Sequence, residues 1–516
     1  MSASTDKKLR QEARAAGTDK KMLAAQEAAK KKAQSKLRWT LGTILAVVLI
    51  AAVLLLNSGI LYKTATALTV GDRKVTPAVA NYYYGNQYVS MINNYGSYIS
   101  MLGLDTSNGI NGLRDQSCSM LENGTWRDYF LQAAETDLSQ ITALKAYAEK
   151  EGISLTEDEI AEVDASFEGM EEYAKAQGYA NANSLFALNY GNGVTAGIVR
   201  EASLDNALAG KAYEHAEQGF VYTAEELEAY YEGLNGARDL FDFLVYDVKA
   251  EVAEGAEAAD EAALAEAAAT AEAISMAYKD GDDIEDITER FTAAVDSQTG
   301  ETGTQAPSAR SGVSGSGLSD SYSEWMLDKA RAEGDVTVVA DSDGSGSSVV
   351  VFLSRNDNHY HTANVRHILI KAAADADGVY TDEAKAAAKA RAEEILAEYE
   401  AGDKTEESFA ALAEQYSEDA GSNTKGGLYE NVYQGQMVAE FDAFCFGGHK
   451  SGDTGIVYGE SGSYAGYHVM YYVGEGELYS SVIAENAMRS EALNTWMSDL
   501  VAPYAPVEKY WIKLVG

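Results

Sequence analysis

The hydrophobic positions along the chain form one long apolar block, followed by alternating helical and strand patterns. Residues 39–56 contain the run LAVVLIAAVLLL, and no charged residue follows until Lys63. A bilayer core needs about 20 apolar residues in a row, and a soluble helix needs a polar side. This pattern predicts a transmembrane helix over 39–57. The alternatives are a buried soluble helix and a cleaved secretory signal.

Helical periodicity dominates the stretch from 66 to 235. Thr76 precedes Pro77, and Thr156 stands three residues before a glutamate, which are both typical helix starts. A short strand-like segment with a Gly-Asp turn comes before the first of these helices. We therefore expect a helical domain over 66–235. Its three consecutive tyrosines at 82–84 fit ordinary packing better than a peptide-binding surface.

Two later stretches share one order of strands, helices and turns. Each begins with a β-type run, LFDFLVYDV from Leu240 and NVRHILI from Asn364, and each closes with a Gly-Asp turn and a strand. This repetition predicts two copies of one α+β module, at 236–355 and 362–475. A C-terminal helix and tail over 476–516 follow them.

Composition and charge restrict the partners of the chain. It has 516 residues, of which 46% are hydrophobic, and a net charge of −40. Residues 1–38 are nevertheless basic, so everything after them is strongly acidic. An acidic surface repels phosphates, which argues against a nucleic-acid partner. The positive-inside rule predicts a cytoplasmic basic tail, one crossing of the cell membrane and an extracytoplasmic bulk.

The chain offers little cysteine or metal chemistry. Cys118 and Cys445 fall in different predicted domains, so two buried or free thiols are expected, with a disulfide as the alternative. His359, His361 and His367 lie close in sequence, but no carboxylate or cysteine completes a zinc spacing. We expect neither a metal nor a cofactor.

The second module resembles the parvulin family of peptidyl-prolyl isomerases. The motifs that carry the resemblance are RHILI from Arg366, FAALAEQYSEDAGS from Phe409, GGLYENVYQGQMVAEF from Gly426, Gly452-Asp453, and GYH from Gly466. The helical domain and the trailing helix are similar, in pattern more than in chemistry, to foldases of the SurA and PrsA type. The expected fold is therefore α+β: one N-terminal transmembrane helix, a helical SurA-N-like chaperone domain and two tandem parvulin-like modules, the first degenerate.

The resemblance implies a set of site residues in the second module. The polar catalytic positions that match the family are His367, Asp419, His468 and Ser463. The apolar positions that match its proline pocket are Leu428, Met437 and Phe441. At Ala465 the chain departs from the family, which commonly has an aromatic residue there, and this departure would loosen one wall of the site.

These residue types suit the isomerisation of a prolyl bond. Rotation about an X-Pro bond crosses a barrier of about 18–20 kcal/mol, but no covalent bond breaks. Catalysis therefore requires only that the twisted amide be stabilised more than the planar one. An apolar pocket can hold the proline ring and exclude water, while polar groups tune the field at the carbonyl.

The first module lacks these residues, because Phe243 and Ser348 stand in place of the two histidines. We expect it to be catalytically silent and to bind or space extended peptide. The resemblance thus implies a membrane-anchored extracytoplasmic isomerase and foldase that acts on unfolded or newly translocated chains with X-Pro bonds. A non-catalytic holdase chaperone and a cell-surface scaffold with a vestigial isomerase fold are the alternatives.

Overall fold

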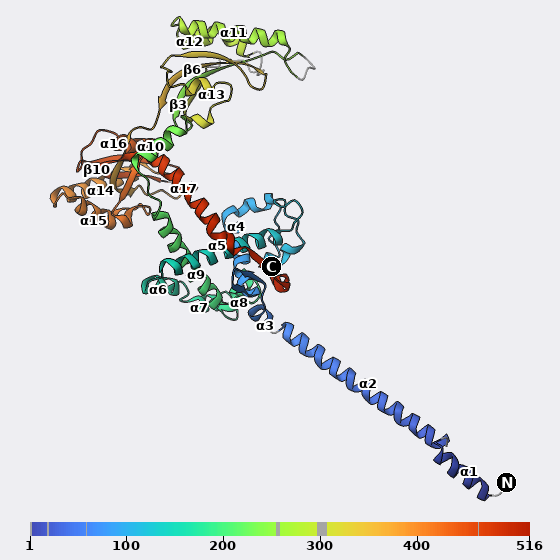
Figure 1. Ribbon diagram of the computed structural model, residues 1–516. Coiled ribbons are helices and arrows are strands. Elements are labelled where there is room, and N and C mark those ends of the chain that lie inside the picture. Colours follow the sequence, from blue (N-terminus) through green and yellow to red (C-terminus); the bar gives the residue numbers. More distant parts are fainter. Residues whose placement is uncertain (1–2, 18–19, 58, 254–257, 297–306, 463) are drawn as a thin grey trace. The chain divides into compact units, whose positions relative to one another are not determined.

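The computed structural model describes residues 3–17, 20–57, 59–253, 258–296, 307–462 and 464–516 (Figure 1). Its internal contacts divide the chain into two compact units. The first comprises Met1–Phe220 and Ala492–Gly516, and the second comprises Val221–Glu491. Both units contain helices and sheet, so the expectation of a mixed fold is confirmed.

The N-terminal part of the first unit contains α1 (Ala3–Ala15) and α2 (Lys20–Asn57). Among the described residues, no helix combines the length and the apolar character that a membrane crossing requires. The prediction of a transmembrane helix at 39–57 is therefore wrong. The predicted single crossing of the cell membrane and the localisation that followed from it are wrong for the same reason.

The physical reason lies in how the apolar run is built into α2. The run is not a separate element, because one helix begins in the lysine-rich segment and continues through it. The side chains from Trp39 to Ile50 are exposed in this helix. The rest of the predicted span, 51–57, lies outside the residues whose side chains the structure describes.

The core of the first unit is formed mainly by α4 (Pro77–Tyr95) and α5 (Trp126–Glu151). Thr76 caps α4 by accepting a hydrogen bond from the Val79 backbone, and Pro77 occupies the first turn, as the sequence predicts. Further helices of the unit are α3 (Ile60–Thr64), α6 (Glu157–Ala165), α7 (Met170–Ala176), α8 (Ala182–Tyr190) and α9 (Ala196–Gln218). Its short 3₁₀ helices are η1 (Gly96–Leu102), η2 (Gly109–Asp115), η5 (Ala502–Tyr504) and η6 (Tyr510–Leu514).

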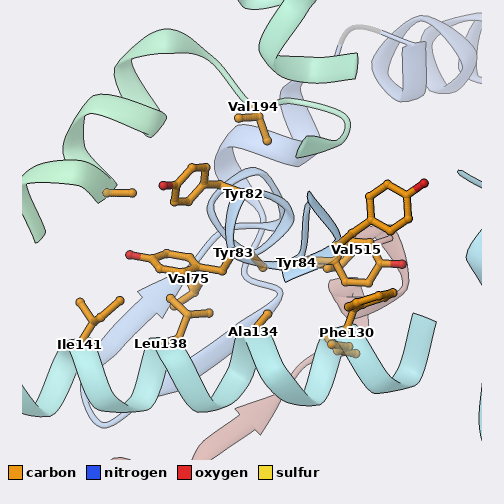
Figure 2. Packing of buried hydrophobic residues seen from close by; sticks show 14 of the residues in the cluster. Val75, Tyr82, Tyr83, Tyr84, Phe130, Ala134, Leu138, Ile141, Val194 and Val515 are labelled. Carbon is orange, nitrogen blue, oxygen red and sulfur yellow. The ribbon is translucent and has the colours of Figure 1, made fainter. Parts of the chain in front are cut away.

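The three consecutive tyrosines of α4 belong to this core. Tyr82, Tyr83 and Tyr84 are 6%, 2% and 0% exposed. Figure 2 shows Tyr83 and Tyr84 above the α5 side chains, with Tyr84 close to Phe130 and Val515. Tyr84 and Phe130 meet edge to face at 6.2 Å. The tyrosines are therefore packing residues, which confirms the interpretation favoured from the sequence.

A small antiparallel sheet joins both ends of the first unit. β1 (Leu68–Val70) pairs with β2 (Arg73–Val75) in a hairpin and, on its other edge, with β11 (Pro506–Glu508) from the C-terminal segment. Two arginines bind backbone carbonyls of the same segment: Arg114 binds that of Lys513 at 2.7 Å, and Arg127 binds that of Val515 at 2.9 Å.

The second unit begins with α10 (Ala224–Gly233) and continues into the first sheet module, 240–356. The strand order of this module is β4-β3-β6-β5. Its strands are β3 (Leu240–Lys249), β4 (Ser308–Ser314), β5 (Val336–Ala340) and β6 (Gly346–Asn356). On one face pack α11 (Glu261–Lys279) and α12 (Ile284–Asp296), and on the other packs α13 (Ser323–Leu327), which follows η3 (Gly315–Gly317).

The second sheet module, 361–478, repeats this topology with the strand order β8-β7-β10-β9. Its strands are β7 (His361–Lys371), β8 (Leu428–Val432), β9 (Thr454–Ser461) and β10 (Tyr464–Leu478). On one face pack α14 (Asp382–Ala401) and α15 (Glu406–Tyr416), and on the other packs α16 (Ala439–Cys445) (Figure 1). A short 3₁₀ helix, η4 (Asn423–Lys425), precedes β8. The helix α17 (Tyr479–Val501) follows β10.

A buried ion pair lies at the base of the first module. Arg355 at the end of β6 binds Asp239 just before β3, with Nε 2.6 Å from Oδ2, and only 3% of the Asp239 side chain is exposed. Tyr231 of α10 donates a hydrogen bond to the same carboxylate at 3.0 Å. Asn358, in the connection between the two modules, donates to the Tyr231 hydroxyl at 2.8 Å. The connection is therefore tied to α10 and to the first module.

The two cysteines are both buried and unbridged. Cys118 lies in the first unit and Cys445 in the second. The expectation of two free or buried thiols is confirmed.

Candidate active site

Two buried histidines lie side by side on the central strands of the second module. In the antiparallel register His367 of β7 faces Met470, and His468 of β10 faces Leu369. The histidines are therefore diagonal neighbours on one face of the sheet. Their Nδ1 atoms lie 3.0 Å apart and their rings stack at 5.2 Å, while only 3% and 4% of the two residues are exposed. The sheet thus brings together residues that are a hundred positions apart in sequence.

Asp419 lies beside His367, in the loop that follows α15. Its Oδ2 atom accepts hydrogen bonds from His367 Nε2 at 3.0 Å, Ser422 Oγ at 2.6 Å and the Tyr429 hydroxyl at 3.0 Å. The hydrogen bond from His367, helped by that from Ser422, holds the pKa of Asp419 well below its usual value despite partial burial. The carboxylate is therefore ionised at physiological pH.

The His468 ring is uncharged. Burial, together with the proximity of His367, lowers the pKa of His468 to about 3. The Tyr464 hydroxyl lies 3.1 Å from His468 Nε2. Gly459 on the neighbouring strand leaves room for this ring, because a methyl group there would lie 2.7 Å from Nε2.

The donors and acceptors fix the hydrogen positions when both rings are neutral. An ionised carboxylate only accepts, so His367 Nε2 carries a hydrogen and its Nδ1 accepts one. His468 must then donate from Nδ1, and its Nε2 accepts from the Tyr464 hydroxyl. The result is one chain of hydrogen bonds from Tyr464 through both histidines to Asp419, in which every ring nitrogen has a partner.

An apolar floor lies beneath the two rings. Phe441 of α16 meets His367 edge-on at 5.4 Å and His468 edge-on at 5.3 Å. Met437 packs against the same apolar cluster from the loop before α16. Leu428 is only half-buried, and since it precedes Tyr429 on β8 its side chain lies on the opposite face of the strand. The structure therefore brings Phe441 to the histidine pair and Met437 to the apolar cluster that includes Phe441, but Leu428 to neither.

Two further predicted positions, Ser463 and Ala465, and three residues that were not predicted remain to be placed. Ser463 lies outside the described residues. Ala465 packs with the residues that face α14 and α15, so the departure from the family there leaves the histidine face unchanged. Sequence reasoning missed the site contacts of Ser422, Tyr429 and Tyr464. Strand alternation could have found Tyr464, which lies four positions before His468 on β10 and so shares its face.

The remaining histidines of the predicted cluster point elsewhere. His359 Nε2 contacts Glu228 at 3.1 Å, and His361 Nδ1 contacts the Gly476 carbonyl at 2.9 Å. In the described part of the chain, no group of three or more His, Cys, Asp or Glu side chains is arranged to hold a metal ion.

Comparison with known proteins agrees with this geometry. The family of the PPIC-type PPIase domain matches residues 350–471. Chaperone SurA of Alkalilimnicola ehrlichii is 36% identical over 118 residues, which cover 22% of this chain and 25% of the relative. The chain contains a parvulin-type peptidyl-prolyl isomerase domain. The expectation drawn from the motifs of the second module is thus confirmed, although the chain spans only about a quarter of the curated relative it matches.

Among solved structures, the chain is similar to two PrsA proteins. The PrsA isomerase of Bacillus anthracis is 22% identical with a TM-score of 0.18, over 28% of this chain and 58% of that one. The foldase PrsA of Streptococcus pneumoniae is 10% identical with a TM-score of 0.23, over 75% of this chain and 91% of that one.

The first module has the strand order of the isomerase domain but different residues at the site. The Phe352 backbone makes hydrogen bonds with the backbones of Gly334 and Asp335. The Tyr472 backbone makes the same bonds with Gly452 and Asp453, so Phe352 corresponds to Tyr472. Four positions earlier on each strand, Ser348 corresponds to His468, as the sequence predicts.

The counterpart of His367 differs from the prediction. Ser348 pairs with Asp247 as His468 pairs with Leu369, so His367 corresponds to Val245, two positions before Asp247. The prediction of Phe243 is therefore wrong. The reason is that spacing along the chain does not report which residues pair across a sheet.

An acidic cluster fills the corresponding space in the first module. By the same register Asp341 stands where the isomerase domain has Gly459. Ser348 donates a hydrogen bond to Asp341 at 2.6 Å, and Lys249 Nζ lies 2.7 Å from the same carboxylate. The clearance that accommodates the His468 ring is thus occupied by a carboxylate and its partners.

Proposed function

We propose that this protein is a peptidyl-prolyl isomerase and foldase that acts on unfolded polypeptides containing X-Pro bonds. The observation that carries the proposal is the buried His367–His468 pair, linked to an ionised Asp419 and lying over Phe441.

In this mechanism the apolar floor and the polar chain have different roles. Phe441 and Met437 hold the prolyl ring and exclude water. The hydrogen-bonded chain of Tyr464, the two histidines and Asp419 presents a fixed field to the amide as it twists and loses conjugation. No bond breaks in this reaction, and each tenfold gain in rate corresponds to about 1.4 kcal/mol of preferential stabilisation of the twisted form.

The foldase part of the proposal concerns longer chains. The first module keeps the strand order of the isomerase domain without its histidines, which suits binding or spacing of extended peptide without turnover. The SurA relative is named a chaperone, and the proposed partners of this chain are likewise unfolded or newly translocated polypeptides. A holdase without turnover is the second candidate, and the same feature of the first module favours it.

A protease-coupled assay on the full chain, with a series of proline tetrapeptides, tests the isomerase. Asp419→Ala and His468→Ala should each lower kcat/KM by about 10²-fold, the scale at which a preorganised polar group contributes. Glu460→Ala is the matched control. The Glu460 carboxylate lies 2.9 Å from Lys385 Nζ and makes no contact with the histidine pair in the described contacts of the site. Unchanged turnover in both site variants would exclude the assignment.

A second assay separates the foldase from the holdase. Suppression of aggregation of an unfolded proline-containing client should persist in His468→Ala, while recovery of its folded activity should slow. Equal recovery with the wild-type chain and with His468→Ala would favour the holdase.

A further inference from the structure

The loop that carries Met437 is held by residues that belong to neither the sheet nor the helices of the isomerase domain. This pocket loop, 433–438, connects β8 to α16. Its Gln434 backbone N–H donates a hydrogen bond to the Tyr360 hydroxyl at 3.1 Å. Its Tyr433 ring stacks on Tyr479 at 4.6 Å, with the planes inclined by only 11°.

The two outer tyrosines come from segments that flank the domain. Tyr360 ends the short connection between β6 and β7, and Tyr479 is the first residue of α17. They also hold each other: the Tyr479 backbone N–H donates to the Tyr360 carbonyl at 2.9 Å, and their rings lie 5.5 Å apart. Tyr360 further meets Phe446, just after α16, edge-on at 5.9 Å. The pair is therefore a connected support and not two separate contacts.

Hydrogen bonds within the pocket loop and to α16 fix its shape and hold it at Gly435, while the two tyrosines hold it at Tyr433 and Gln434. The Tyr433 backbone N–H donates to the Gln436 side chain at 3.1 Å, and the Gly435 N–H donates to Asp442 of α16 at 3.1 Å. Burial raises the pKa of Tyr360 to about 12, so the group stays a hydroxyl at physiological pH, and its oxygen accepts the Gln434 N–H.

We propose that Tyr360 and Tyr479 are positioning residues for the proline pocket. They set where Met437 lies against the apolar cluster, and so how tightly the prolyl ring is held, without touching the substrate. The inference rests on the proposed isomerase function. Because neither tyrosine contacts His367, His468 or Asp419 in the described contacts of the site, the effect falls on binding and not on the twisting step.

Steady-state kinetics on the full chain test this role. Tyr479→Leu removes the stacked ring and should raise KM for a proline tetrapeptide about three- to tenfold with kcat nearly unchanged, the range that an aromatic pair supports. Tyr479→Phe keeps the ring and should restore the wild-type KM. Tyr467→Leu is the matched control, because it breaks a pair with Tyr458 at 5.1 Å among the residues that pack with α14 and α15.

Three kinetic outcomes would overturn the proposal: an unchanged KM in Tyr479→Leu, a fall in kcat at unchanged KM, or an equal rise in KM in Tyr467→Leu. Thermal unfolding of each variant checks that the chain remains folded.

Hydrogen exchange tests the support independently of turnover. Tyr360→Phe removes the acceptor of the Gln434 N–H, so exchange in the pocket loop should accelerate several-fold relative to the wild type. Tyr230→Phe is the control, since its hydroxyl donates to Glu491 and not to the loop. Unchanged exchange in Tyr360→Phe would refute the support even if the wild-type chain is an active isomerase. A wild-type chain without turnover, but with accelerated exchange in the variant, would instead refute the isomerase function.

Discussion

Gly459→Ala offers a sharp test of the histidine site, because the change adds one methyl group at a known distance. The new carbon would lie 2.7 Å from His468 Nε2 and 3.0 Å from the Tyr464 hydroxyl. Favourable contacts need about 3.5–4.0 Å, so ring and strand must separate by roughly 0.8 Å. His468 has little space to retreat, because His367 stacks on it and Phe441 meets it edge-on.

Two costs follow from this displacement. Overpacking a buried site costs about 1–3 kcal/mol, and the hydrogen bond between the two Nδ1 atoms, now 3.0 Å long, would weaken or break at a further cost of about 0.5–1.5 kcal/mol. We expect Gly459→Ala to lose about 1.5–4.5 kcal/mol of unfolding free energy. Turnover should fall more steeply, by about 10- to 100-fold, since a catalytic group displaced by 1 Å can lose about 10² in rate.

Denaturant unfolding and the tetrapeptide assay measure both effects on the full chain. Gly474→Ala is the matched control, because it lies on the same strand as His468 but a methyl group there meets no heavy atom within 4 Å. If Gly459→Ala turns over peptide like the wild type while remaining folded, the position of His468 does not matter for catalysis and the site is misassigned.

Three further predictions address stability and the division of labour. The pKa of His468 is about 3 in the folded chain and about 6.5 when unfolded. Its contribution to stability is therefore complete above pH 6.5 and is lost as the pH falls towards 3. In urea unfolding, the stability of His468→Asn should fall less between pH 7 and pH 4.5 than that of the wild type, and parallel curves would contradict this. The chain with both His367→Ala and His468→Ala should show no turnover of tetrapeptides, because we expect the first module to be silent; residual catalysis would contradict that expectation. Asp239→Asn leaves Arg355 without its buried partner and should cost about 3–5 kcal/mol of unfolding free energy, whereas a loss below 1 kcal/mol would mean that the pair is solvated.

The sequence predicts the chemistry of the second module better than its geometry. His367, Asp419 and His468 stand at family spacing, and the structure brings all three within hydrogen-bond contact. Tyr464 was missed although strand alternation places it on the same face as His468, whereas Tyr429 lies on a different strand and reaches His367 only through strand pairing. The counterpart of His367 in the first module was misplaced by two positions for a related reason, since pairing across strands decides it.

The predicted anchor illustrates a different limit. The apolar residues alone indicated an independent span, but the structure continues one helix from the lysine-rich segment into the apolar run.

The helical domain was easier to anticipate, because caps such as Thr76 and Thr156 act locally and need no knowledge of distant contacts. The pairing of β11 with β1 joins segments more than 400 residues apart, and no local pattern reports it.

Gly459 and Asp341 occupy corresponding positions in the two modules, and the difference between them shows how far the modules have diverged. An imidazole introduced at Ser348 would meet the carboxylate that occupies the clearance Gly459 provides in the other copy. Removing that carboxylate alone would leave Lys249 without its partner and create no catalyst. No single substitution therefore creates a catalytic site in the first module. Several changes together, including a histidine at Val245, would be needed. The residue at one strand position, Gly459 or Asp341, thus decides whether a module of this topology has room for an imidazole ring at all.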